Sequence, residues 1–303
     1  MESIHLAGNY TNKKAGIGNT FIHLFFILYS LCCVLPIVIV IATSLSNELD
    51  IVRDGYGLWP KGFTAFAYET ILKNPVLILR SYGVTALVSL AGVTLGLWLT
   101  ASIAYVISRK DFFMRRQLSL YVFFTMIFNG GVVPFYILIA VWLMLGDSLL
   151  ALILPYLVIP WYVLVFKGFF KGISVSLIES AKIDGQGELG IFVKIIIPLS
   201  KPAIATVGLF LLLQYWNDWW LSLLFINNEK LYTLQYLLVR ILNNIEFMAN
   251  NASKLGVVAK DMIFPSLSAR FAMCIIAAGP MLFIFVFFQK YFATGIMVGS
   301  LKE

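Results

Sequence analysis

The sequence predicts an all-α integral membrane protein with six transmembrane helices, and this prediction depends on its composition and on where its charges lie. Of its 303 residues, 60% are hydrophobic and 12% are charged. Ordinary soluble domains have roughly 45–50% and 25%. The mean hydropathy is +0.90, and the apolar residues come in long uncharged blocks, which fit spans of lipid better than one large core. A soluble enzyme, a nucleic-acid-binding protein and a disordered scaffold are therefore excluded.

Six segments are long enough to cross a bilayer. Five contain no Lys, Arg, Asp or Glu and the fifth in order is interrupted only by Asp218; they are 15–47, 81–108, 117–146, 148–166, 202–228 and 271–289. A helix needs about 20 residues to cross ~30 Å of hydrocarbon, so each block holds one span. A signal peptide behind Lys13 and Lys14 is the alternative for the first block, but its apolar stretch is too long and has no small-residue cleavage site. We predict one transmembrane domain over residues 1–303.

The net charge of +7 indicates orientation rather than a nucleic-acid partner. Basic residues in short loops collect on the cytoplasmic side of a membrane, where the lipid is anionic. A short basic turn separates the second and third blocks and contains Arg109, Lys110, Arg115 and Arg116. Placing this turn inside puts both termini and the loop 167–202 in the cytoplasm. The loops at about 48–79 and 228–268 then lie outside, and their mixture of Gly, Pro and Asn with apolar residues predicts partly helical surface loops.

Few side chains in this sequence are suited to covalent chemistry. The histidines are His5 and His23, no Gly-x-x-x-x-Gly-Lys-Ser/Thr phosphate loop occurs, and no metal-binding spacing is present. The three cysteines all lie in apolar blocks, are odd in number and are predicted to be packing residues; they are Cys32, Cys33 and Cys274. An enzyme acting inside the membrane would need paired catalytic groups at depth, and only Asp218 is present. We expect no catalytic residue, no metal site and no bound cofactor in this chain.

The predicted cytoplasmic loop contains a short helix. Ser176 and Glu179 have the spacing of a capping box, and Gly185 is placed to end the helix. Apolar positions between them are supplied by Leu177, Ile178, Ala181 and Ile183. This pattern predicts two to three turns. Because so short a helix is marginal in water, we expect packing against the membrane domain or a partner to hold it.

The same loop reads Glu179-Ser-Ala181, then Asp184-Gly185, and further on Phe192, Ile195, Pro198-Leu199 and Pro202, where the two prolines end the apolar stretch 191–197 before the fifth span. This pattern resembles the EAA loop of the permease subunits of bacterial ABC importers, with Ser180 and Ile197 as mild departures. An ordinary interfacial loop is the alternative. In that family the helix is a coupling helix that sits in a groove of a separate ATP-hydrolysing subunit. The resemblance assigns this ATPase-coupling role to Glu179, Ser180, Ala181, Asp184, Gly185 and Pro198.

The resemblance also implies an architecture and a set of partners. The fold would be that of an ABC type I importer permease in the bacterial cytoplasmic membrane. ATP and Mg²⁺ would be bound by two partner ATP-binding cassette subunits, so the chain would be a transport subunit without an ATPase site. A second homologous permease and an extracellular solute-binding protein would complete the importer. Transport would proceed by alternating access.

Three further segments resemble the permeases of carbohydrate importers; they are 124–134, 151–155 and 289–302. The likeness is to the branch that handles larger saccharides, such as alginate- or pectin-derived oligosaccharides. It implies an oligosaccharide as substrate. Within the first segment, Asn129-Gly-Gly131 would be either a helix break or a point of close packing between helices, and we favour packing.

The fifth block contains a candidate translocation path, whose residues are Gln214, Tyr215, Trp216, Asn217, Asp218 and Trp219. On a continuous helix Gln214, Asp218 and Ser222 form one polar stripe, and a charge at that depth should face the bundle interior, a wet cavity or the outer interface. Aromatic faces with amide and carboxylate groups suit a sugar, although Asp218 would repel a uronate. An aromatic belt with an interfacial carboxylate is the alternative. An ion-gradient-driven secondary transporter remains the rival function, but no internal repeat is visible.

Overall fold

The computed structural model describes residues 17–73, 75–251 and 266–300, and the side chains of 19–73, 75–248 and 267–286. His5, Lys13 and Lys14 lie outside the described residues, as do the side chains of the segment 289–302. The described chain is mostly helical and contains no strand. The all-α fold expected from the sequence is therefore confirmed.

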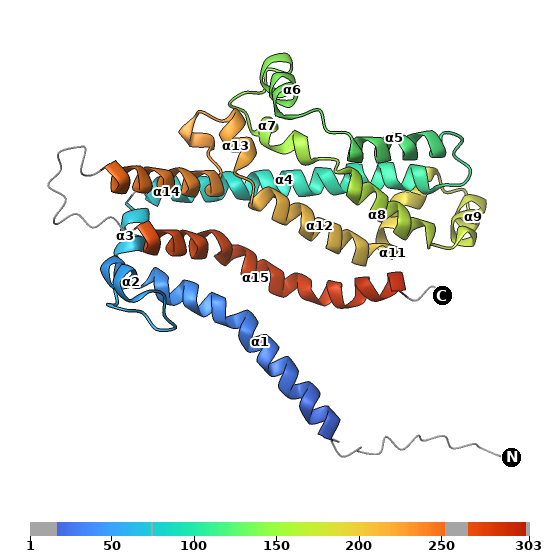
Figure 1. Cartoon of the computed structure of the whole chain (residues 1–303). Helices are drawn as coiled ribbons and strands as arrows, with labels where there is room; N and C mark the ends of the chain where they lie inside the picture. The colour runs from blue at the N-terminus through green and yellow to red at the C-terminus, as the bar shows by residue number, and fades with distance from the viewer. Residues whose placement is uncertain (1–16, 74, 252–265, 301–303) are drawn as a thin grey trace.

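Three helices are each long and apolar enough to cross a membrane: α1 (Ile17–Ser44), α4 (Pro75–Ser108) and α15 (Ser266–Ser300) (Figure 1). Three pairs of helical segments, each bent at a short break, are also long and apolar enough to cross a membrane when the two members count together. The first joins α5 (Arg115–Ile127) to α6 (Val132–Tyr136) and η1 (Ile137–Trp142), the second joins α7 (Leu149–Ile153) and η2 (Leu154–Tyr156) to α8 (Pro160–Lys171), and the third joins α10 (Glu188–Ile191), η3 (Phe192–Ile196) and α11 (Ile197–Leu199) to α12 (Lys201–Trp216). Their bends are 113°, 46° and 83°. The described residues thus provide up to six spans when each bent pair counts as one.

The connecting segments hold shorter helices: α2 (Glu48–Asp54), α3 (Phe66–Ile71), α9 (Val175–Ile183), α13 (Trp220–Phe225), η4 (Glu229–Leu231) and α14 (Leu234–Asn251). The segments 48–79 and 228–268 are partly helical, as expected. The first of them is tied to α15, because the Glu48 carboxylate accepts hydrogen bonds from the backbone N–H groups of Leu267 at 2.8 Å and Ser268 at 3.0 Å. A carboxylate distant in sequence thereby caps the N-terminus of α15.

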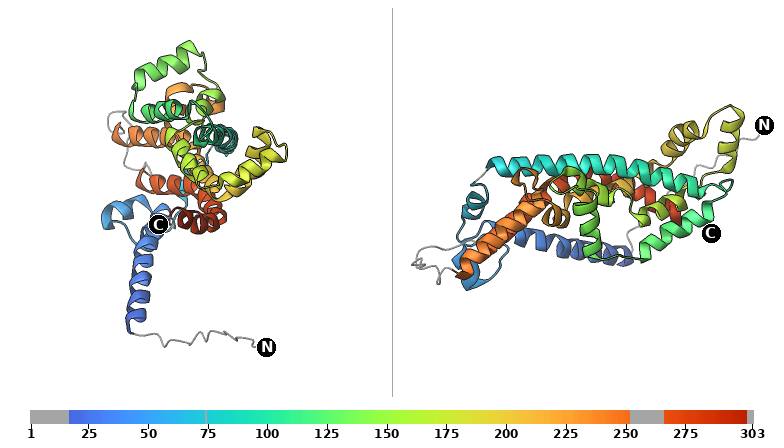
Figure 2. Two further views of the ribbon diagram at one scale, coloured as in Figure 1. Left: turned by 90° about the vertical axis from the view of Figure 1, so that its right-hand side faces the viewer. Right: turned by 90° about the horizontal axis from the view of Figure 1, so that it is seen from above.

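α4 runs through the centre of the bundle. At 1.5 Å per residue its 34 residues extend about 51 Å, and α12, α8 and α14 pack along it (Figures 1 and 2). Figure 1 and the right-hand view of Figure 2 place the start of α1 and the end of α15 toward the end of the bundle that carries α9. We call this the α9 end. An even number of membrane crossings brings the start of the first helix and the end of the last to the same end of the bundle.

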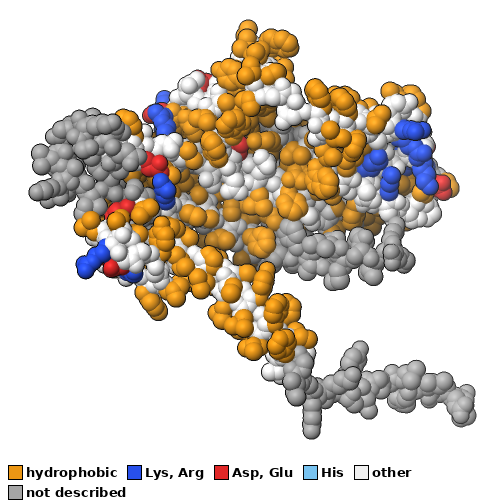
Figure 3. Space-filling view, in the orientation of Figure 1, with side chains coloured by type: hydrophobic (Ala, Val, Ile, Leu, Met, Phe, Trp, Pro, Cys, Tyr) orange, Lys and Arg blue, Asp and Glu red, His pale blue; other side chains and the backbone are white. Residues whose placement is uncertain are grey.

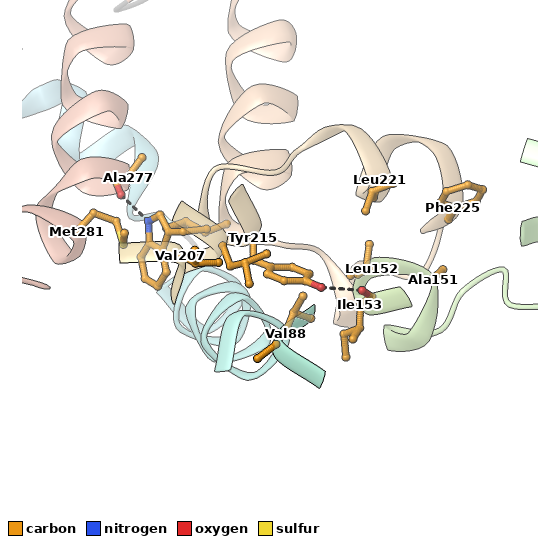
Figure 4. Close-up of a cluster of buried hydrophobic side chains, with 14 of the residues drawn as sticks. Val88, Ala151, Leu152, Ile153, Val207, Tyr215, Leu221, Phe225, Ala277 and Met281 are labelled. Atoms are coloured by element: carbon orange, nitrogen blue, oxygen red, sulfur yellow. Dashed lines mark hydrogen bonds between the residues drawn. The ribbon is translucent and has the colours of Figure 1, made fainter. Parts of the chain in front are cut away.

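Tyr215 joins three elements of the core. Its ring lies against α4 at Gly92, where an added Cβ would meet ring carbon Cζ at 2.3 Å. Its hydroxyl donates to the Ile153 carbonyl of α7 at 2.7 Å (Figure 4). The Tyr215 side chain is 2% exposed, so α4, α7 and α12 meet around one buried aromatic ring.

Two expectations from the sequence are wrong. The chain at Asn129-Gly-Gly131 breaks the helix between α5 and α6 instead of packing closely: Gly131 has φ +86°, and an added Cβ at Gly130 or Gly131 would meet no atom within 4 Å. The three cysteines are exposed and not packed; they are Cys32, Cys33 and Cys274. The first two lie on α1, which contacts the bundle along α15 and leaves its most apolar stretch unburied.

Gly92→Ala should destabilise the protein by about 1–3 kcal/mol, because the new methyl group overlaps the Tyr215 ring and a packed core yields only with strain. The matched control is Gly83→Ala on the same helix, where an added Cβ meets nothing within 4 Å and alanine favours the helix. Thermal unfolding of the two purified variants in detergent measures the difference. Equal melting temperatures would contradict the close approach at Gly92.

Candidate functional site

The helix predicted in the loop 167–202 is α9, which has nine residues. It begins two residues earlier than the predicted capping box: its N-cap position is Ser174, whose side chain caps no backbone N–H, and the Ser174 and Ser176 hydroxyls pair with each other at 2.7 Å. Its end agrees with the prediction. Gly185 has φ +78°, its N–H donates to the Lys182 carbonyl at 3.0 Å, and the next N–H, that of Gln186, donates to Ala181 at 2.9 Å. These paired bonds form a Schellman motif, which needs a residue that tolerates positive φ.

α9 has an inner and an outer face. Ile178 and Ala181 are buried against the rest of the chain, at 8% and 6% exposed. At 100° per residue, Glu179, Ser180 and Ile183 fall on the opposite side, and all three are exposed. Ile183 is 87% exposed. A short helix that packs one face and leaves an isoleucine in the open on the other presents that outer face to another molecule.

Four charged side chains fasten α9 to the α9 end of α4 and to α10, and we call them the ion cluster: Arg109, Asp111, Lys182 and Glu188. Arg109 binds Asp111 through two parallel hydrogen bonds of 2.9 and 2.6 Å. The Lys182 ammonium lies 3.2 Å from Asp111 and 2.7 Å from Glu188. The hydroxyl of Tyr105, near the end of α4, donates to Glu188 at 2.8 Å. These contacts join α9 to the end of α4 and to α10.

Both carboxylates of the ion cluster are held in the charged form. The hydrogen bonds from the Arg109 guanidinium hold the pKa of Asp111 well below its usual range. The hydrogen bond from the Lys182 ammonium lowers the pKa of Glu188. A carboxyl group whose pKa is depressed in the folded protein contributes stability above its unfolded pKa, and that contribution is lost as pH falls through the folded pKa. The cluster is thus complete at neutral pH.

In the wild-type chain, the amides of α9 should keep constant protection against hydrogen exchange from about pH 8 to pH 5. They should lose it progressively below about pH 4, the ordinary carboxyl pKa, as the pH falls toward the lowered pKa of Asp111 and Glu188. The variant Asp111→Asn with Glu188→Gln should already show about two- to fivefold lower protection at pH 7, because exposed ion pairs contribute modestly. Hydrogen exchange of 175–186, read by mass spectrometry as protection factors, measures both. Asp54→Asn at the other end of the bundle is the control. Unchanged protection in the double variant would refute the fastening role.

A second site lies where α12 ends. The chain breaks at residues 217–219 before α13 begins, so the predicted polar stripe through Gln214, Asp218 and Ser222 does not exist on one helix. Ser222 is buried, and its hydroxyl pairs with that of Thr233 at 2.8 Å. The break opens a pocket of about 530 Å³, which we call the 218 pocket; its lining residues are Tyr156, Tyr162, Phe210, Leu213, Gln214, Asn217, Asp218, Trp219 and Trp220.

Asp218 organises the break. One carboxylate oxygen accepts the Tyr156 hydroxyl at 2.8 Å, and the other accepts the backbone N–H of Leu221 in the first turn of α13 at 3.1 Å. The Asn217 side chain donates to the Leu213 carbonyl at 3.0 Å, which closes the end of α12. The carboxylate therefore caps α13 and joins it to η2, while the pocket is bordered by amide groups and aromatic rings.

The six candidate path residues divide into two groups. Gln214, Asn217, Asp218 and Trp219 line the 218 pocket. Tyr215 and Trp216 do not, because their side chains are buried and donate to backbone carbonyls, the Trp216 indole N–H to Ala277 at 3.0 Å (Figure 4). These two side chains pack α12 against α4, α7 and α15.

Sequence reasoning missed several residues of both sites. Tyr156, Tyr162 and Phe210 line the 218 pocket from η2, α8 and α12. Asp111 and Glu188 belong to the ion cluster. Nothing in their local spacing marks them, because each meets its partners only through the fold. Trp220 continues the aromatic run of the candidate path and could have been included on that ground.

A family model described as the binding-protein-dependent transport system inner membrane component matches residues 92–298, which hold α9, the ion cluster and the 218 pocket. The chain belongs to this family. It is a permease subunit of the ABC importers, a multi-pass protein of the bacterial cell membrane and a transport protein.

Curated relatives match nearly the whole chain. The polygalacturonan/rhamnogalacturonan transport system permease protein YtcP of Bacillus subtilis is 37% identical over 92% of this chain and 96% of its own length. The protein LplC of the same organism is 35% identical over 89% of both. The arabinooligosaccharides transport system permease protein AraQ, also from Bacillus subtilis, is 28% identical over 92% of this chain and 94% of its own length.

The fold is also known from a solved structure. The crystal structure of a bacterial ABC transporter involved in the import of the acidic polysaccharide alginate contains a chain that superposes with a TM-score of 0.75. The alignment covers 93% of this chain and 99% of that one, at 24% identity. This agreement shows that the bent pairs and long helices form the architecture of an ABC importer permease.

Proposed function

We propose that this chain carries an oligosaccharide across the cytoplasmic membrane and is driven by ATP hydrolysed in separate subunits that grip α9. The outer face of α9 is the observation that carries the proposal, because a two-and-a-half-turn helix fastened on one face and open on the other suits a reversible mechanical contact. The family description supports dependence on a binding protein. The relatives named for polygalacturonan and arabinooligosaccharides support a saccharide as cargo.

The proposed coupling residues have different tasks. Glu179, Ser180 and Asp184 are exposed and would meet the ATP-hydrolysing subunit, while Ala181 packs the helix inward. Gly185 supplies the reversal that ends the helix. Pro198 lies one residue before the end of the helix 188–199, which the bend of 83° joins to α12. A pull on α9 would therefore reach α12, and with it the 218 pocket at the far end of that helix.

The importer would contain several chains. Two ATP-binding cassette subunits would hold ATP and Mg²⁺, a second homologous permease would complete the path beside the 218 pocket, and an extracellular solute-binding protein would deliver the sugar. The basic character of the α9 end supports a cytoplasmic position for it and for both termini. The segments 48–79 and 228–268 would then face the binding protein.

In the 218 pocket, Trp219 and Trp220 offer exposed aromatic faces, and Gln214 and Asn217 offer amide groups. Such rings cover the apolar face of a sugar, and the amides suit its hydroxyl groups. The Asp218 carboxylate accepts hydrogen bonds from the Tyr156 hydroxyl and the Leu221 N–H, so its main role is to cap α13. We assign the cargo-facing role to Gln214, Asn217, Asp218 and Trp219, with Tyr215 and Trp216 as supports.

Glu179→Arg should uncouple transport, because it reverses a charge on the outer face of α9 without touching the buried face. The assembled importer should insert normally, lose most of its copurifying ATP-hydrolysing subunit and lose at least about tenfold in ATP-dependent oligosaccharide uptake into proteoliposomes. The control is Glu69→Arg, an exposed charge reversal at the opposite end, which should leave the copurification unchanged. Uptake that ignores Glu179→Arg and ATP but collapses with an ion gradient would indicate a secondary transporter instead.

Trp219→Ala should raise the oligosaccharide concentration for half-maximal uptake roughly tenfold, since an aromatic contact contributes about 1 kcal/mol or more beyond its buried area. Trp142→Ala, at an indole that is 75% exposed and outside the pocket, is the matched control. Uptake in proteoliposomes at a series of sugar concentrations separates affinity from maximal rate. Equal half-saturation in both variants would remove Trp219 from the path.

A further inference from the structure

A second pocket, of about 640 Å³, lies between α9 and the nearby ends of α5 and α8. Five basic and two acidic side chains line it, so its lining carries a net charge of +3. Figure 3 shows Lys and Arg side chains gathered at this end of the molecule, next to a largely apolar surface. We call it the basic pocket.

The positive charge of the basic pocket is only partly neutralised. Two of the five cations, Arg109 and Lys182, are paired within the ion cluster. The other three are Lys110, Arg115 and Lys171, and none forms an ion pair with a described residue of the chain. Of the two lining acids, Asp111 is held by Arg109 and Lys182, which leaves Glu179 alone to balance three cations.

Two of the unpaired cations lie close to a further cation on α8. Arg115 and Lys171 are both within electrostatic reach of the ammonium group of Lys167, one turn before Lys171 on α8. That ammonium group donates to the Ser119 hydroxyl of α5 at 2.6 Å. α5 begins at Arg115 without a side-chain cap, so its positive helix end adds to the same field. This concentration of positive charge favours binding of an anion.

The basic pocket lies at the level where two apolar helices end. Arg115 is the first residue of α5, and Lys171 is the last of α8. Beyond Arg115, α5 carries exposed apolar side chains such as Leu120, 67% exposed. The basic pocket also has apolar walls, formed by Phe170, Ile173 and Val175. Cations above an apolar wall at the boundary of the hydrocarbon match a ligand with a charged head and an apolar body.

The geometry points to binding of an anionic phospholipid in the basic pocket, with its phosphate at Arg115 and Lys171 and its apolar part against Ile173 and Val175. The apolar walls favour lipid over free phosphate. The ATP-hydrolysing partner is a poorer fit. Of the outer-face residues of α9 only Glu179 lines the pocket, whereas Ser180 and Ile183 do not, and the buried Ile178 does. The lipid would fill the space beside α9 and stiffen its connection to α5 and α8.

The test uses the assembled importer, purified in detergent and given equal amounts of dioleoylphosphatidylglycerol and dioleoylphosphatidylcholine. Native mass spectrometry measures which lipid is retained. The pocket variant is Arg115→Gln with Lys171→Gln, and Lys171→Gln alone is a milder form should the double variant fail to assemble. The matched control is Lys194→Gln with Lys201→Gln, which removes two exposed charges at the same end outside the basic pocket.

Wild type and control should retain phosphatidylglycerol in preference, and the pocket variant should bind it about tenfold more weakly, because each basic residue near the phosphate contributes to binding. Millimolar inorganic phosphate should not displace the lipid. Equal losses in the pocket variant and the control would mean a diffuse surface charge and would overturn the site. Displacement of the lipid by inorganic phosphate would overturn the proposal and indicate a free anion as the ligand. Unchanged lipid retention with release of the ATP-hydrolysing subunit would assign these cations to the protein partner.

Discussion

The whole arrangement depends on one constraint: a nine-residue helix outside the membrane cannot hold its own position. Helices of this length are marginal in water, so α9 can transmit force only if the chain fixes it from behind. The chain uses two means. Ile178 and Ala181 bury the inner face, and Lys182 joins two carboxylates that are also bound by Arg109 and Tyr105. Apolar packing sets the distance of α9 from the bundle, and the charges set its register along α4 and α10.

α4 carries this connection to the rest of the molecule. Its last turns hold Tyr105, next to the ion cluster, and its middle holds Gly92, against the Tyr215 ring of α12. Nearer its start, the Thr85 hydroxyl accepts the backbone N–H of Leu234 at 2.8 Å. One straight helix therefore contacts the anchor of α9, the helix that leads to the 218 pocket and the helix α14 at the opposite end. A movement of α9 would therefore act on a rigid helix that contacts both α12 and α14, and not on a flexible loop.

The sequence was sufficient for the apolar blocks, the helix at 175–183 and the turn at Gly185, because each depends on residues close together in the chain. It failed where partners are distant. The capping box at Ser176 was wrong because the helix already begins at Val175, and the stripe through Asp218 assumed a continuous helix where the chain breaks and Asp218 binds a tyrosine 62 positions earlier. The cap that Glu48 forms on α15 is likewise a contact between residues distant in sequence, which no local pattern could indicate. Local patterns specify elements, whereas breaks within the spans are specified by groups that arrive from other helices.

The break at 217–219 illustrates why a helix break needs polar side chains nearby. Ending a helix inside a membrane frees backbone N–H and C=O groups, and each is costly to leave without a partner where water is absent. Here Asp218 accepts the N–H of Leu221, and the Thr233 hydroxyl donates to the Asp218 carbonyl at 3.3 Å. The polar side chains at the break therefore form hydrogen bonds with the freed backbone groups. The pocket beside the break is bordered by amide groups and aromatic rings. A membrane protein that needs a wet, polar pocket between apolar helices can obtain it by breaking a helix where such partners are in reach.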